Sequence, residues 1–133
     1  MNEFQLEIVT PDGLLFEGPA KKLIVRTTEG DVGILPHHSD YLTSLSIGVA
    51  KVFTEDKVRI ASCADGLLSV SEGRVRLVAA TFEWAEDIDV ERAKNAKERA
   101  EHKLKETESD YESRLARVKL KRALARISAS ENK

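Results

Sequence analysis

The chain has 133 residues, of which 41% are hydrophobic and 33% are charged, and its formal net charge is −2 at pH 7. This length suits one modest domain or a small domain with an appendage, and the balanced charge excludes a global field that would attract nucleic acid or an anionic membrane. A single cysteine, Cys63, excludes an internal disulfide and a structural zinc site, and we expect it to be a buried small hydrophobe. The N-terminal stretch lacks an export signal, and no run of about 18 apolar residues predicts a membrane-spanning helix.

The first part of the chain has the periodicity of β-strands. Between Phe4 and Trp84 apolar residues recur mostly at every second position, as in segments 4–8, 23–25, 58–60 and 75–77. Turn sequences separate these runs: PDG at 11–13, TEGD at 28–31, TEDK at 54–57, ADG at 64–66 and SEGR at 71–74. Short strands at this spacing predict a β-sandwich or a barrel.

Within this part, the segment GDVGILPHHSDYLTSL at 30–45 carries His37 and His38 side by side. Adjacent residues of an extended chain point to opposite faces, so both rarely bind one ion, and His102 has no HxxxH companion. Acid/base chemistry with Asp40 would need a nucleophile and a pocket that the sequence does not supply. We therefore favour a structural or interface loop over a metal site.

After Trp84 glycine and proline are absent, and the composition shifts to strong helix formers. Asp87 or Asp89 can cap a first helix, and the stretch TESD at 107–110 separates it from a second helix. We expect a β-sandwich domain over 1–84 and an antiparallel helical hairpin over 85–133. The apolar stripe of the first helix is narrow and mostly alanine, so the hairpin should be marginally stable alone. That stripe consists of Ala93, Ala96 or Lys97, Ala100 and Leu104.

The second helix is expected to have two neighbouring apolar faces, and its composition is strongly basic. Its expected apolar faces are Tyr111, Leu115 and Val118, and beside them Ala116, Leu120, Ala123 and Ile127. Between Tyr111 and Ile127 a single acid, Glu112, faces a run of basic residues: Arg114, Arg117, Lys119, Lys121, Arg122 and Arg126. A solvated helix usually interleaves charges of both signs, so this run predicts an acidic partner or a polyanion.

A phosphate site is the sharper form of that prediction. Arg122 and Arg126 share a helix face, as do Arg92 and Arg99, so the four guanidiniums could converge on a phosphate if the helices fold together. The alternative is that Asp89 only caps the first helix and that Arg92 and Arg99 pair with nearby acids. No Walker loop and no GxGxxG occurs, so catalysis on a nucleotide is not expected.

Two motifs and their order resemble one known family, the epsilon subunit of bacterial F-type ATP synthases. The segment EGDVGILPHHSDYLTSL is similar to the EGxxGxLPxHxPLLT segment of that family, and IDVERA at 88–93 is similar to its ID/LDxxRA motif. The opening FQLEIVTPDGLLFEG resembles the first hairpin of the family, and ADGLLSVSEGRVRLVAATFEWAEDID resembles its last strands and linker. The resemblance covers nearly the whole chain, with one departure at Asp40, where the family usually has proline.

The resemblance implies a β-sandwich of about ten strands followed by an α-helical hairpin, in a non-catalytic subunit of the central rotor stalk. It implies the gamma subunit, the c-ring and the alpha and beta subunits as partners. The location would be the cytoplasmic face of the cell membrane, reached only through the complex. For the loop residues that match the family, it implies contact with gamma and the c-ring: Asp31, His38 and Thr43.

For the hairpin, the family implies a compact form and an extended form, of which the extended one opposes ATP hydrolysis. In the extended form the contacts with the beta subunit would come from Arg114, Arg117, Lys119, Lys121 and Arg122. Several members bind ATP in the compact form as a regulatory ligand, with no required cofactor. The matching positions here are Glu83, Ile88, Asp89, Arg92, Ala93, Arg99, Arg122 and Arg126.

Other classes of protein remain as alternatives. The leading one is a protein-binding adaptor of another assembly. A nucleic-acid binder is disfavoured because the basic helix lacks interleaved aromatic residues. An independent enzyme is disfavoured because the chain offers no nucleophile, phosphate cradle or ligand cluster.

Overall fold

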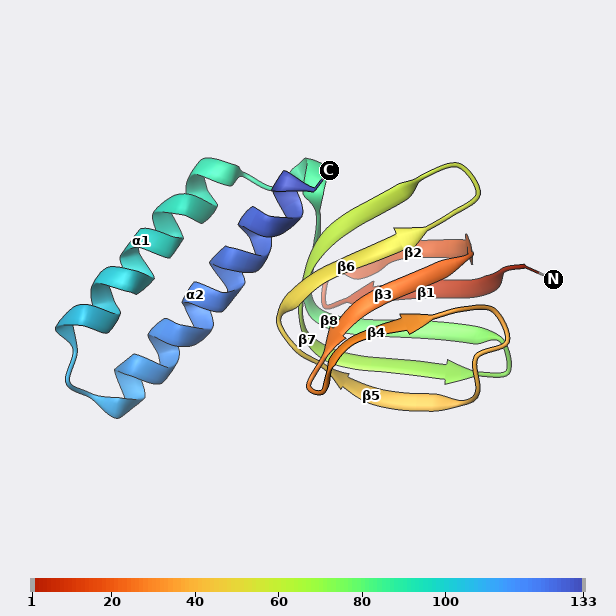
Figure 1. The fold of residues 1–133 in the computed structure, drawn as a ribbon, viewed down its shortest axis with the longest axis horizontal. Coiled ribbons are helices and arrows are strands. Elements are labelled where there is room, and N and C mark those ends of the chain that lie inside the picture. The colour runs from red at the N-terminus through yellow and green to blue at the C-terminus, as the bar shows by residue number, and fades with distance from the viewer. Residues whose placement is uncertain (1, 133) are drawn as a thin grey trace.

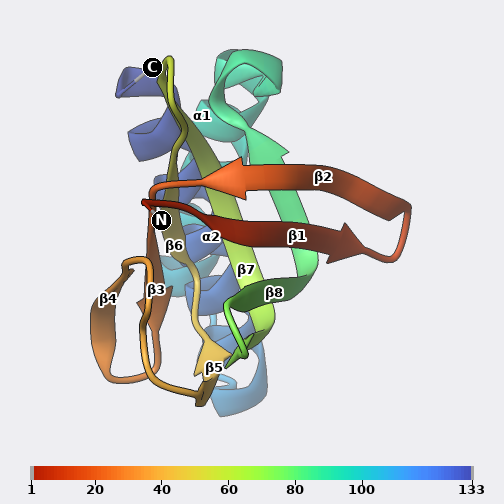
Figure 2. The ribbon, with the colours of Figure 1, turned by 90° about the vertical axis from the view of Figure 1, so that its right-hand side faces the viewer.

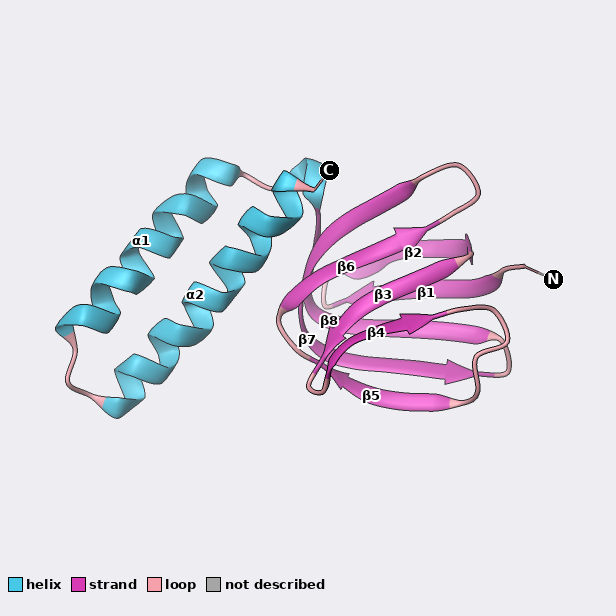
Figure 3. Cartoon of the chain, in the orientation of Figure 1, coloured by secondary structure: helices cyan, strands magenta, loops and turns pink. Residues whose placement is uncertain are grey.

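A computed structural model describes residues 2–132 and shows a β-sandwich followed by two antiparallel helices (Figure 1; Figure 3). The strands are β1 (Phe4–Thr10), β2 (Gly13–Ala20), β3 (Lys22–Thr27), β4 (Gly30–Ile34), β5 (Tyr41–Leu45), β6 (Gly48–Phe53), β7 (Val58–Ser71) and β8 (Arg74–Trp84). A 3-10 turn, η1 (Ala85–Asp87), leads to the helices α1 (Val90–Glu106) and α2 (Asp110–Glu131). The predicted sandwich with a helical hairpin is confirmed.

The predicted number of about ten strands is wrong, because the described residues form eight. One reason is the sequence ADG at 64–66, which was expected to be a turn and instead lies inside β7, a strand of 14 residues. The other four predicted turns lie between or at the ends of strands, as expected. A long strand that serves two layers of a sandwich replaces two short ones.

The strands are joined by hydrogen bonds in the order β2-β1-β8-β7-β5-β3-β4, with β6 pairing to both β3 and β7. β1 runs parallel to β8, and the other pairs are antiparallel. Because β7 pairs with β6 along its first half and with β5 along its second half, it belongs to both layers of the sandwich (Figure 2).

The core lies between these layers and consists of strand residues. The predicted alternation is confirmed for β1, where Leu6 and Ile8 are fully buried, and for β3 and β8. For β7 the expected face was wrong, because Val58 is 48% exposed while the neighbouring face buries Ala61 and Cys63.

The hairpin packs through alanine. Asp89 caps α1 by accepting a hydrogen bond from the backbone N–H of Arg92 at 3.1 Å, and Ser109 caps α2 in the same way. Ala100 of α1 and Ala116 of α2 are buried in the predicted stripes. Figure 1 shows that α2 lies against the sandwich, over β6 and β7, and that α1 covers the outer side of α2. The other expected apolar face of α2 is exposed: Tyr111, Leu115 and Val118.

Candidate functional site

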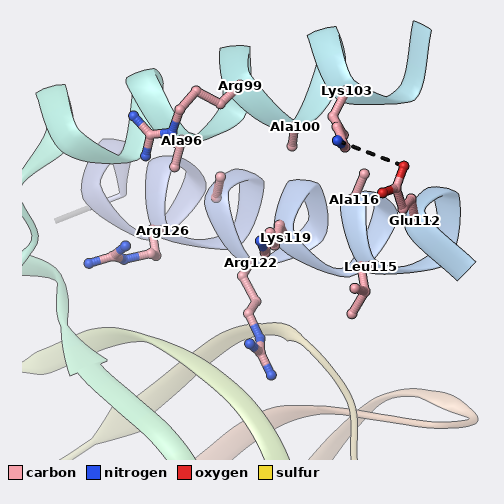
Figure 4. A pocket seen from close by; sticks show the side chains of 11 residues that line it. Ala96, Arg99, Ala100, Lys103, Glu112, Leu115, Ala116, Lys119, Arg122 and Arg126 are labelled. Atoms are coloured by element: carbon pink, nitrogen blue, oxygen red, sulfur yellow. Dashed lines mark ion pairs between the residues drawn. The ribbon is translucent and has the colours of Figure 1, made fainter. Parts of the chain in front are cut away.

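A cleft of about 570 Å³ lies between α1 and α2, and its lining is strongly basic (Figure 4). Alanine and leucine side chains form the apolar wall of this cleft, among them Ala96, Ala100 and Ala116. Five cationic side chains line the cleft against one carboxylate, Glu112; they are Arg99, Lys103, Lys119, Arg122 and Arg126. The volume falls in the range of small-molecule sites, roughly 300–1,000 Å³.

The negative charge of Glu112, the single acid of the cleft, is offset by partners within the hairpin. Thr107 Oγ1 donates a hydrogen bond to Glu112 Oε2 at 2.7 Å, and Lys103 Nζ lies 3.7 Å from the same oxygen. The hydrogen bond from Thr107, with a smaller contribution from the Lys103 charge, holds the pKa of Glu112 below its usual range. The remaining cations therefore give the cleft a net positive charge that suits an anionic ligand.

Two of these arginines point out of the cleft. In Figure 4 the side chains of Arg122 and Arg126 extend away from α1, toward the sandwich, whereas Arg99 extends along α1. Arg126 donates two hydrogen bonds to Glu83 at 2.8 and 3.3 Å, and Arg122 donates one to Asp65 at 3.0 Å. Both arginines also line a second cavity, of about 370 Å³, between α2 and the sandwich. They lie between the two cavities and can serve either one.

The expected convergence of four guanidiniums is therefore found only in part. Arg99, Arg122 and Arg126 line one cleft, but Arg92, which is exposed, lines neither cavity. Lys103 was missed as a member of this site, although its spacing of four residues from Arg99 places the two on one helix face.

The motif at 88–93 has structural roles in this form. Ile88 and Ala93 are buried, and Asp89 is the N-cap of α1. Like Arg92, these three residues line neither cavity. Their assignment to ATP stays a prediction, as does that of Glu83, which lines the second cavity.

A contact that the sequence analysis did not predict fixes the segment in which the chain passes from the sandwich to the hairpin. The guanidinium of Arg59 lies over the ring of Trp84, 3.7 Å from its centroid, and Nη2 donates to Glu86 Oε1 at 2.7 Å. This hydrogen bond is the main cause of the lowered pKa of Glu86. The contact joins β7, the end of β8 and the turn η1, from which the hairpin leaves.

The residues expected to contact gamma and the c-ring lie in two places. His38 is in the loop between β4 and β5, where its Nδ1 is 2.7 Å from the Ser39 carbonyl and its ring contacts Tyr41, and Thr43 follows in β5. Asp31 lies at the start of β4, forms an ion pair with Arg26 at 2.8 Å and lines a groove beside α2. The basic residues assigned to the beta subunit are exposed along α2 in this form: Arg114, Arg117, Lys119, Lys121 and Arg122.

The outer surface of the sandwich carries apolar side chains that the sequence analysis did not single out. Leu14, Leu67 and Val78 are each at least 42% exposed, and Leu42 is 71% exposed. The strand pairing places Leu14 beside Val9, Val9 beside Val78, and Val78 beside Leu67. These four residues therefore form one row across four strands. The signal in the sequence is that these strands carry apolar residues at consecutive positions instead of strict alternation.

Within residues 2–132 no group of three or more His, Cys, Asp and Glu side chains is arranged to hold a metal ion. The helices in that range include none that is long and apolar enough to cross a membrane.

The fold and the cleft define a class of protein: a β-sandwich that carries a docked, basic two-helix hairpin. Residues 3–85 match the family described as ATP synthase, Delta/Epsilon chain, beta-sandwich domain, and residues 86–131 match the family described as ATP synthase, Delta/Epsilon chain, long alpha-helix domain. The chain belongs to the ATP synthase delta/epsilon chain family.

Individual relatives agree with this assignment over the full length. The chain is 41% identical to the ATP synthase epsilon chain of Ruminococcus albus, with 100% of both chains covered. It is 39% identical to the ATP synthase epsilon chain of an Exiguobacterium species, with 100% of this chain and 99% of the relative covered. In fold it is similar to a chain of the Euglena gracilis mitochondrial ATP synthase, with a TM-score of 0.87 at 23% identity over 97% of this chain and 82% of the other.

Proposed function

We propose that this chain is a non-catalytic epsilon subunit in the central stalk of an F-type ATP synthase, and that its hairpin senses ATP. In this proposal ATP binds the compact form and favours it, and the extended form opposes ATP hydrolysis. The observation that carries the proposal is the cleft between α1 and α2, which is lined by five cationic side chains and by one carboxylate, whose charge Lys103 offsets. Its volume and charge suit a nucleotide with several phosphates.

The regulation follows from differential binding. ATP can shift the hairpin only insofar as it binds the compact form better than the extended one. A ligand at 100 times its dissociation constant favours the form that binds it by about 2.7 kcal/mol. That amount is enough to reset a hairpin whose helices bury mainly alanine, such as Ala100 and Ala116. High ATP would hold the hairpin down, and low ATP would let it rise and oppose hydrolysis.

The decisive experiment is a calorimetric titration of the whole subunit with ATP, with and without magnesium, and with GTP as the specificity control. We expect saturable binding of ATP that Arg122→Ala and Arg126→Ala weaken at least about tenfold, because each removes a charge-assisted contact. Arg114→Ala is the matched control, since Arg114 is an exposed arginine of α2 that does not line the cleft. Unchanged affinity in both cleft variants would refute this site, and no binding at millimolar ATP would refute the sensing function.

The sandwich is proposed as the part that contacts the gamma subunit and the c-ring. Two features support this: the loop with His38 and Thr43, and the exposed apolar row that includes Leu67 and Val78. Exposed apolar patches of this kind mark protein contacts. We expect purified gamma to be captured by the wild-type chain and much less by Leu67→Asp, with the exposed charge change Lys57→Asp as control. The subunit would then lie at the cytoplasmic face of the membrane as part of the complex.

A further inference from the structure

The hairpin is joined to the sandwich by two ion pairs of unequal burial. The Glu83–Arg126 pair is bidentate and about 30% exposed, with side-chain values of 33% and 28%. The Asp65–Arg122 pair has one hydrogen bond of 3.0 Å and is about half exposed, at 51% and 46%. The second pair is the one that a competing anion can reach and replace most easily.

Asp65 owes its position to an irregularity in β7. In the first half of the strand the core face carries Ala61 and Cys63, and strict alternation would turn residue 65 into the core as well. After the irregularity the core face carries Leu68 and Val70, so the alternation has shifted by one residue. A regular strand would therefore bury the carboxylate in an apolar core, whereas this one leaves it exposed.

Two adjacent left-handed residues lie at that shift. Asp65 has φ of +54° and Gly66 has φ of +149°, and the pairing with β8 passes directly from Ala64 with Thr81 to Gly66 with Ala79. A Cβ on residue 66 would lie 1.8 Å from the carbonyl oxygen of Val78, so only glycine fits there. The left-handed conformation at Asp65 is uncommon for a residue other than glycine, and such strained residues often mark functional positions.

The irregularity directs the Asp65 carboxylate toward Arg122, which also lines the cleft between the helices. Carboxylate and phosphate bind the planar guanidinium through the same kind of charge-assisted hydrogen bonds. An anion in the cleft and Asp65 therefore compete for one side chain. Figure 4 shows Arg122 turned toward the sandwich, in the orientation that serves Asp65.

We propose that Asp65 of β7 is a positioning residue for the hairpin. In the absence of ligand its carboxylate binds Arg122, as a phosphate would, and so holds the hairpin on the sandwich. When a phosphate-bearing ligand enters the cleft, Arg122 leaves Asp65 for the phosphate; this second half rests on the proposed function. The pair is then present only in the ligand-free compact form, and absent from both the ligand-bound form and the undocked form.

Because the pair is present in only one of the three forms, its loss has a predictable direction of effect on docking and on ATP binding. Loss of the pair destabilises only the ligand-free compact form, so the hairpin should undock more easily and ATP should bind more tightly. A residue with a merely structural role would weaken both docking and binding. An ion pair this exposed changes an equilibrium by at most about fivefold, which sets the size of both effects.

The docking half is tested without ligand, by hydrogen exchange of the α2 amides in the whole subunit. We expect Asp65→Asn and Arg122→Ala each to lower their protection by two- to fivefold, about the limit for an exposed pair, and the double variant to lower it no further. Glu29→Gln, which removes an exposed charge from the turn between β3 and β4, should leave it unchanged. Unchanged protection in Asp65→Asn, or additive losses in the double variant, would overturn the proposal.

The transfer of Arg122 from Asp65 to the phosphate is tested by titrating the same variants with ATP. We expect Asp65→Asn to bind ATP up to about fivefold more tightly than the wild type, and to make no difference in the Arg122→Ala background. Weaker binding by Asp65→Asn, or an equal gain in the absence of Arg122, would show that no exchange occurs. If the wild type binds no ATP, both the sensing function and the transfer of Arg122 to a phosphate are refuted. The hydrogen-exchange result still decides whether Asp65 holds the hairpin on the sandwich.

Discussion

Cys63 shows how strongly one position of the sandwich is removed from water. It lies in β7 at 4% exposure, and burial, with a smaller contribution from the Asp65 charge, raises the pKa of its thiol to about 12. The prediction of a buried small hydrophobe is therefore confirmed. A thiol with this pKa is protonated at neutral pH and is a poor nucleophile.

The raised pKa makes stability depend on alkaline pH. A cysteine of the unfolded chain has a pKa of about 8.5, so above that pH the unfolded state loses a proton that the folded state keeps until about pH 12. The thiol's contribution is complete below about pH 8.5 and is lost as the pH rises toward 12, at about 1.4 kcal/mol per unit. We expect Cys63→Ala to be less stable at pH 7 but to lose less stability between pH 9 and 11. Urea titrations at each pH measure this, and parallel losses in the two proteins would contradict it.

The arginines illustrate which part of a site can be predicted at the scale of residues. Their spacing places Arg122 and Arg126 on one face of α2, which the sequence analysis used correctly. The spacing does not say which neighbour each guanidinium reaches. Their partners, Asp65 and Glu83, are 57 and 43 residues away along the chain, and only the docking of two elements brings them near.

At the scale of elements, α1 depends on its first turn. Asp89 accepts a hydrogen bond from the Arg92 backbone N–H, and Glu91 adds an acid to the same turn. The helix packs mainly through alanines, so a lost cap is a large part of its stability. A cap residue also lies in the motif that the family resemblance assigns to ATP, and the two roles can be separated.

We expect Asp89→Ala to lower the stability of α1 by about 1 kcal/mol, because it removes the cap. Asp89→Asn is the matched control, since asparagine caps about as well as aspartate. The readout is hydrogen exchange of the amides in the first two turns of α1, measured without nucleotide. Equal losses in both variants would show that the charge, and not the cap, is what the helix requires.

The strands show where local sequence patterns stop being informative. ADG at 64–66 has the composition of a turn, but β7 continues through it because the strand has hydrogen-bonding partners on both sides of the irregularity, β6 before it and β5 after it. Those partners are set by the topology of the whole sandwich. Local propensity predicted four of the turns that connect strands, and it wrongly predicted a fifth turn at 64–66, where tertiary pairing decides.

At the scale of the whole molecule, the two parts are joined asymmetrically. The buried core cluster contains only residues from Phe4 to Trp84, and no helix residue belongs to it. Trp84 closes this core at the exit of the chain, with Phe82 and Phe16 against its ring and Arg59 over its face. The sandwich therefore has its own core, whereas the hairpin depends on α2 lying over β6 and β7.

This asymmetry predicts that the hairpin can be removed without unfolding the sandwich. A chain that ends after Ile88 keeps the whole core cluster and the Arg59–Glu86 contact at the exit. We expect it to melt in one cooperative transition within a few degrees of the full chain, because the hairpin adds only partly exposed ion pairs and small apolar contacts to the sandwich. Thermal melts followed by the fluorescence of Trp84, the single tryptophan, measure this for both chains. Loss of the cooperative transition in the shortened chain would mean that the hairpin is part of the folding unit, and a switch in which it leaves the sandwich would then require the sandwich to be held by another subunit.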